Sequence, residues 1–341
     1  MLELLKELCA APGVSGAEEA VAAVILRELD TIPGVEVETD SLGNILAFKK
    51  GKERPKNNIL LSAHMDEVGF VVRFIEAEGF LRIAPVGGID PRVVVGKTVL
   101  VGREQLPGVI GIRAVHHQSP DERGKAPSFD ELYVDIGAAS REDAEKHLRL
   151  GDFVTFHGPV IPLGEGLLRG RALDDRAGCL LLLELLRQEL PVDVTCAFTV
   201  QEEVGCIGAK TAAYAAQPQV AIAVETTTAA DIAGVAPDKQ VCRLGAGPVV
   251  SFMDKGTVYD GALYQLAMDT AKAAGIPAQT KSMVAGGNES RSVQVARRGA
   301  KVLAVSLACR YLHSPACVLS KEDIRSTLAL LTALLPGAGA L

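Results

Sequence analysis

Histidine and acidic residues follow several apolar runs of this sequence. The runs are typical of buried strands, and they occupy residues 58–63, 192–200, 220–224 and 302–307. The polar residues that follow them are His64 with Asp66, Glu202 with Glu203, Glu225, and His313. In open α/β sheets, ligands bind at the carboxyl ends of the strands. Histidine and carboxylate ligands gathered from several strand ends are typical of a two-metal hydrolase.

The first of these positions predicts an oriented histidine. Asp66 lies two residues beyond His64. Its carboxylate can therefore bend back to the imidazole and fix the tautomer, as carboxylates do beside metal-bound histidines. The alternative is a histidine at a strand end in a polar loop, without a metal role.

Glu202 and Glu203 are the sharper indication of metal chemistry. Two adjacent glutamates in a buried cleft would repel each other unless cations were present. With metals, one glutamate can be a ligand and the other a general base for bound water. The alternative is a solvated turn.

Three further residues complete the candidate set. Asp174 precedes an expected helix, and its two oxygens could bridge two cations; alternatively, Asp174 and Asp175 favour the helix as a cap and a first-turn acid. Glu225 ends so apolar a strand that its carboxylate requires a cation or a helix end. His313 is the fifth ligand candidate, although a lone histidine is more often structural.

The elements expected to position these residues are of two kinds. Helices alternate with apolar strands before residue 67 and after residue 170, which predicts an α/β domain. Between them, short strands are punctuated by glycine and proline, which predicts an inserted β-rich module. We therefore expect one discontinuous domain of residues 1–67 and 163–341, and a second domain of residues 68–162. Ser15 is expected to cap the helix predicted at Glu18–Leu29. Residues 116–127 are expected to form a loop, and the tail from Gly337 is expected to fray.

Charge, apolar stretches and cysteine content argue against a nucleic-acid partner, a membrane span and secretion. The net charge of −7 provides no basic stripe for a nucleic acid. No apolar stretch approaches the roughly 20 residues of a membrane span, and the start of the chain lacks the pattern of a secretory signal. The seven cysteines are scattered and include no Cys-x-x-Cys pair, which favours reduced, buried thiols in a cytoplasmic protein.

Four ordered motifs resemble those of a known family. They are Ala-His-Met-Asp-Glu-Val-Gly at 63–69, Ala-Leu-Asp-Asp-Arg-Ala-Gly at 172–178, Gln-Glu-Glu-Val-Gly at 201–205, and Arg-Tyr-Leu-His-Ser-Pro at 310–315. This set is similar to the signature of the tetrahedral, or glutamyl, metallo-aminopeptidases. The similarity extends over nearly the whole chain, including residues 133–138 and 251–256.

The resemblance implies both a fold and an assembly. It implies a mixed-sheet, zinc-peptidase-like α/β catalytic domain with an inserted PDZ-like β-barrel that serves in dimerisation. Members of the family are cytoplasmic enzymes that form dimers and often hollow dodecamers. The segment from His116 to Arg123 does not resemble the usual family sequence, so no role is assigned to it.

The resemblance also implies a set of site residues. One metal would be held by His64, Asp174 and Glu225, and the other by Asp174, Glu203 and His313. Asp174 would bridge the two ions, and Glu202 would be the catalytic base. Asp66, from its spacing to His64, is the other candidate catalytic residue. The sequence departs from the family at Glu225 and Glu289, where many members carry aspartate.

These observations predict a co-catalytic two-metal aminopeptidase acting on peptides with a free N-terminus. Zinc and cobalt are the expected metals, because both accept mixed nitrogen and oxygen ligands. The alternatives are a metal-dependent deacylase or a glycan hydrolase using the same ligands, or a non-catalytic assembly protein.

Overall fold

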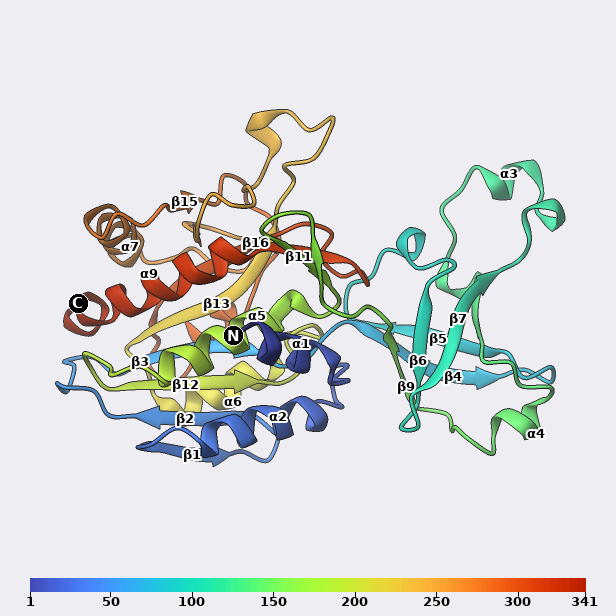
Figure 1. Cartoon of the computed structure of the whole chain (residues 1–341), viewed down its shortest axis with the longest axis horizontal. Coiled ribbons are helices and arrows are strands. Elements are labelled where there is room, and N and C mark those ends of the chain that lie inside the picture. Colours follow the sequence, from blue (N-terminus) through green and yellow to red (C-terminus); the bar gives the residue numbers. More distant parts are fainter.

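The computed structural model describes residues 1–341, with every side chain except that of Glu122. Its largest element is an eight-stranded sheet that contains both parallel and antiparallel pairs (Figure 1). In sheet order the strands are β1 (Val35–Thr39), β2 (Ile45–Lys49), β12 (Val194–Thr199), β3 (Ile59–His64), β13 (Val220–Thr228), β16 (Lys301–Cys309), β14 (Val249–Val250) and β15 (Gln279–Thr280). The central strands β12, β3, β13 and β16 are parallel. The structure therefore confirms the predicted mixed α/β sheet.

Helices cover both faces of this sheet. One face packs against α1 (Leu2–Ala10), α2 (Glu19–Asp30), α5 (Leu173–Leu186), α7 (Gly261–Ala273) and α9 (Lys321–Ala340). The other face packs against α6 (Ile207–Ala216) and the short α8 (Ser290–Val293). Strand β3 contributes side chains to both cores, because Ile59 and Leu61 face the larger core and Leu60 faces the smaller one. This alternation follows from the two-residue period of a strand.

A closed six-stranded barrel interrupts the α/β arrangement (Figure 1). Around the barrel the strands are β4 (Gly69–Ile75), β5 (Leu81–Val86), β8 (Leu132–Asp135), β7 (Leu106–Ile112), β6 (Thr98–Val101) and β9 (Phe153–Phe156). The barrel has its own apolar core, in which the rings of Phe70 and Phe156 meet edge to face at 5.3 Å. Short helices lie in its connections: η1 (Pro91–Val93), η2 (Val115–His117), α3 (Pro120–Arg123), η3 (Phe129–Glu131) and α4 (Arg141–Ala144).

A small antiparallel sheet lies beside the large one. It consists of β10 (Ile161–Leu163), β11 (Leu167–Gly170) and β17 (Cys317–Ser320). The remaining described element is η4 (Pro237–Lys239). Within the described residues, no helix is both long and apolar enough to cross a membrane.

Two local predictions were wrong. Ser15 does not cap α2, whose N-cap is Glu18; instead, its hydroxyl donates to Asp66 Oδ2 at 2.6 Å. The tail does not fray, because α9 continues to Ala340 and Gly339 packs closely against Pro55. The predicted loop at 116–127 holds two short helical segments, η2 and α3.

Candidate metal centre

Strand register brings the candidate ligands to one edge of the large sheet. His64 is the last residue of β3 and pairs with Thr199 at the end of β12. The parallel ladder between β13 and β3 runs from Val220 opposite Ile59 to Ala223 opposite Ser62; continued by two residues, it sets Glu225 level with His64. Glu225 does not end its strand, as the sequence suggested, because β13 continues beside β16 to Thr228.

The predicted ligand residues form two groups that share Asp174. One group comprises His64, Asp174 and Glu225, and the other comprises Asp174, Glu203 and His313. Within each group the possible ligand atoms lie within 4.8 Å of one another. Asp174 Oδ1 is 3.5 Å from His64 Nε2, while its Oδ2 is 3.5 Å from His313 Nε2. The two oxygens of one carboxylate therefore face separate groups, which is the arrangement of a bridging ligand.

Neighbouring carbonyl and carboxylate oxygens orient both histidines. Nδ1 of His64 lies 3.1 Å from the carbonyl oxygen of Asp66 and 3.3 Å from Asp66 Oδ1. Nδ1 of His313 lies 2.6 Å from the carbonyl oxygen of Gly88. A proton on each Nδ1 would donate to these acceptors and leave Nε2 free to bind a metal, as in most histidine-ligated sites.

Two carboxylate oxygens of the site are buried without a hydrogen-bond partner among the side chains that the structure describes. They are Asp174 Oδ1 and Glu225 Oε1. An ionised carboxylate buried in this way is costly unless a cation neutralises it. Oxygen and imidazole ligands suit zinc and related divalent ions. The residues present therefore fit two divalent metal ions.

The electrostatics of the cluster lead to the same conclusion. Burial raises the pKa of Glu203 to about 8, and it also raises the pKa of Glu202 and Glu225. Burial opposes ionisation of Asp174 too, but the neighbouring imidazoles of His313 and His64 hold its pKa below the usual range. So many crowded acids favour a cation that allows all of them to ionise.

Glu202 lies in the same cavity but outside both ligand groups. Its Oε1 accepts a hydrogen bond from the Cys206 thiol at 3.1 Å. Asp66 holds the backbone beneath it, because its two carboxylate oxygens accept from the amides of Glu202 and Glu203 at 2.9 and 3.1 Å. Asp66 is thus a positioning residue for His64 and for both glutamates.

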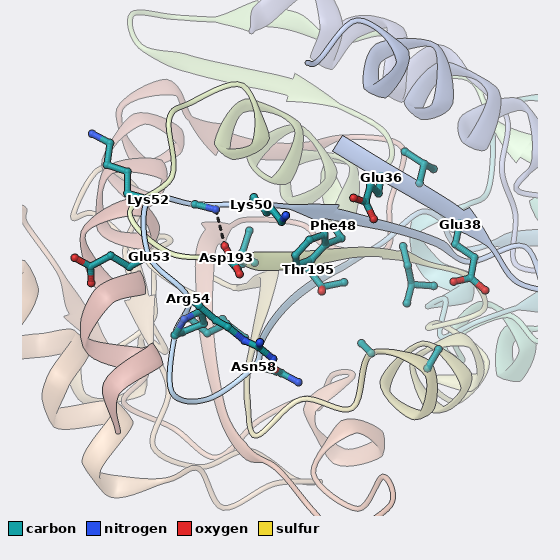
Figure 2. Close-up of a pocket in the computed structure, with 18 residues that line it drawn as sticks. Glu36, Glu38, Phe48, Lys50, Lys52, Glu53, Arg54, Asn58, Asp193 and Thr195 are labelled. Atoms are coloured by element: carbon teal, nitrogen blue, oxygen red, sulfur yellow. Dashed lines mark hydrogen bonds between the residues drawn. The ribbon is translucent and has the colours of Figure 1, made fainter. Parts of the chain in front are cut away.

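The cavity at this edge of the sheet has a volume of about 520 Å³. A larger hollow, of about 950 Å³, lies elsewhere (Figure 2). That hollow is lined by Asn58 and Asp193, which precede β3 and β12, and by charged residues of both signs such as Glu36 and Lys52. It therefore lies at the amino ends of these strands, away from the candidate ligands.

Several residues of the site are missing from the sequence-based prediction. Ser15, Gly88, Cys206 and Lys281 contact or line the site from distant parts of the chain. Only Cys206 lies beside a recognised motif, the one at 201–205, and nothing in the sequence near Gly88 or Lys281 indicates a functional residue. Helix α6, which Cys206 precedes as N-cap, was also not predicted. His116 and His117 belong to neither ligand group among the described residues.

The mixed sheet, the inserted barrel and the paired ligand groups together define a metallohydrolase. A family model described as M42 glutamyl aminopeptidase matches residues 43–330. The chain belongs to this family, and it is a peptide hydrolase.

Curated and structural relatives cover nearly the whole chain. A lysyl aminopeptidase of Pyrococcus furiosus is 34% identical over 344 residues, which cover 98% of this chain and 96% of the relative. The structure of an aminopeptidase from Desulfurococcus kamchatkensis has a TM-score of 0.93 at 32% identity and covers 98% of this chain and 94% of that one. A Pyrococcus horikoshii TET peptidase, described as assembling into a tetrahedron or an octahedral shell, has a TM-score of 0.86 at 34% identity, with 98% of both chains covered.

Proposed function

We propose that this protein is a two-metal aminopeptidase that removes the first residue of peptides with a free N-terminus. The observation that carries the proposal is the pair of ligand groups that share Asp174, with Glu202 beside them as an acid that belongs to neither. Family membership supports the same reaction.

His64, Asp174 and Glu225 would hold one ion, and Asp174, Glu203 and His313 the other. When bound, divalent ions acidify water and polarise the scissile carbonyl. Glu202 accepts the proton of the attacking water on a carboxylate oxygen and returns it to the leaving amine. The thiol of Cys206 and the two backbone contacts of Asp66 keep Glu202 in place. Zinc and cobalt are the proposed metals, because both suit this ligand set.

We assign catalysis and dimerisation to two different domains. Residues 1–67 and 163–341 form the catalytic domain, and residues 68–162 form an inserted, PDZ-like dimerisation domain. Dimers, and a dodecamer built from them, are supported by the reported shells of the TET peptidase relative. The seven free, buried cysteines support a cytoplasmic location.

A substrate comparison with and without metal tests the proposed reaction. The substrates are an unblocked peptide, the same peptide acetylated at its N-terminus, and a β-glucan. We expect release of the first amino acid from the unblocked peptide alone, its loss after exhaustive chelation, and its return when zinc or cobalt is added. Full activity in a preparation shown by elemental analysis to be metal-free would refute the mechanism. Preference for the acetylated peptide or the glucan would support a deacylase or a glycan hydrolase.

A further inference from the structure

One cation lines the cavity that contains the candidate metal ligands. Lys281 directly follows the edge strand β15. It is the only lysine or arginine that lines the cavity within the part of the chain whose side chains are described. The other ionisable lining residues are His64, Asp90, Asp174, Glu202, Glu203, Glu225 and His313. All but one of them belong to the proposed catalytic set, so Lys281 is an isolated positive charge in an acidic pocket.

Lys281 is buried without an ion-pair partner. Lys281 is only 7% exposed, and its Nζ donates to the carbonyl oxygen of Ala285 at 2.6 Å. No described carboxylate oxygen lies within 4.0 Å of Nζ, so Lys281 forms no ion pair with these residues. The nearby Asp254 already accepts hydrogen bonds from the amides of Gly256 and Thr257 and from the hydroxyl of Tyr259.

The surroundings of Lys281 favour an anionic ligand. Burial lowers the pKa of its ammonium group, whereas the charges of Asp254 and Glu225 raise it. A buried ammonium with a single carbonyl acceptor has donors left for a carboxylate. Thr226 of the neighbouring strand β13 lines the same cavity. The cavity therefore offers a cation together with the metal ligands.

We propose that Lys281 binds the side-chain carboxylate of an acidic first residue, so that the enzyme selects peptides that begin with glutamate or aspartate. This inference rests on the proposed aminopeptidase function. Glu225 and Thr226 of β13 line the same cavity as Lys281, so a first side chain that leaves the metal ligands along β13 would be directed to the ammonium group. Family membership does not decide the specificity, because the family description is glutamyl and the P. furiosus relative is a lysyl aminopeptidase.

A purely structural role for Lys281 predicts different kinetics. Its bond to Ala285 could simply hold the segment between β15 and α8 in place. Loss of that bond would then lower turnover of every substrate alike. Glutamyl and glutaminyl substrates separate the two roles, because their side chains have nearly the same shape and differ in charge.

The test compares kcat/KM for glutamyl, glutaminyl, leucyl and lysyl p-nitroanilides with the metal-loaded enzyme. We expect the wild type to prefer the glutamyl over the glutaminyl substrate by roughly 10- to 100-fold, the size of one charge-assisted hydrogen bond. Lys281→Gln keeps a donor for Ala285 but removes the charge. It should lower the glutamyl value to that of the glutaminyl substrate and leave the glutaminyl value within about twofold. Lys281→Glu should favour the lysyl substrate. Lys272→Met, on the exposed side of α7, is the matched control and should retain the wild-type ratio.

Two results would overturn the inference while leaving the proposed function intact. One is equal kcat/KM for the glutamyl and glutaminyl substrates in the wild type, with leucyl or lysyl substrate hydrolysed. The other is an equal loss for all substrates in Lys281→Gln. Failure to hydrolyse any of the four substrates or an unblocked peptide would instead refute the proposed aminopeptidase function, and with it the role of Lys281.

Discussion

Glu202 and Glu203 are adjacent in the sequence, but their side chains have different partners. Oε1 of Glu203 lies 3.3 Å from His313 Nε2 and belongs to a ligand group with Asp174. Glu202 instead accepts from the thiol of Cys206. The left-handed backbone conformation of Gln201, with φ of 56°, and the anchoring of both amides by Asp66 hold this tight turn. The two carboxylates can therefore have separate roles, one as a ligand and one as a base.

Glu202→Gln tests this separation at the level of one atom. The variant should keep a metal content near that of the wild type, because Glu202 is in neither ligand group. Its turnover should fall by about 10²- to 10⁴-fold, the usual size of general acid–base assistance. Elemental analysis and steady-state kinetics check the two expectations. Glu203→Gln is the matched comparison and should lose metal; loss of one metal equivalent in Glu202→Gln instead would show that the two roles are exchanged.

Glu225 follows the apolar first half of strand β13, and its carboxylate lies in the candidate site. Residues 220–224 are buried valine, isoleucine and alanine, and Glu225 follows with only 7% of its surface exposed. Its Oε1 lies 3.9 Å from His64 Nε2 and has no hydrogen-bond partner in the described part of the chain. The side chain of Glu225 is one methylene longer than the aspartate of many family members, but its carboxylate still lies beside His64.

Substitution of Glu225 tests whether this strand provides a ligand. Glu225→Ala should lose about one metal equivalent and most of the activity, because the first group would keep only His64 and the shared Asp174. Glu225→Asp should retain partial metal binding, since it keeps the charge but withdraws the oxygens by one methylene. Metal stoichiometry and activity equal to the wild type in Glu225→Ala would show that Glu225 is not a ligand.

At the scale of the whole molecule, the barrel and the α/β part meet at the candidate metal ligands. The carbonyl oxygen of Gly88, which follows β5, lies 2.6 Å from Nδ1 of His313. Asp90 and Val93 from the same connection line the cavity. The barrel segment thus provides an orienting group for one ligand and part of the cavity wall, in addition to its proposed role in dimerisation.

Replacing residues 68–162 with a short linker tests both roles of the barrel. We expect monomers by light scattering, because the proposed dimer contact is removed. We also expect loss of the metal held by His313, whose orienting carbonyl is gone. The metal held by His64, Asp174 and Glu225 should remain, and its presence is the control for correct folding. An assembly of unchanged size would place the subunit interface on the α/β part of the chain.

Elements with a strong local signal were predictable from the sequence. The apolar strands β3, β12, β13 and β16 lie where the hydrophobic runs placed them. Elements without such a signal were missed. Helix α6 is rich in alanine and buries only small side chains, so its apolar face is hard to recognise. Strands β14 and β15 have two residues each, too few to show a period.

The sequence by itself determined which residue types lie near the ends of the apolar strands. This information is local, because strand formation and the position of a polar residue after an apolar run depend on neighbouring residues. The family resemblance indicated that Glu225 and Glu203 belong to separate groups that share Asp174, and the tertiary structure brings the ligand atoms of each group together. Only the tertiary structure decided which distant groups complete the site. The hydroxyl of Ser15, the carbonyl of Gly88 and the ammonium of Lys281 reach it through strand register and barrel placement. Contacts between residues so far apart in the chain leave no periodic pattern in the sequence, so they become visible only after folding.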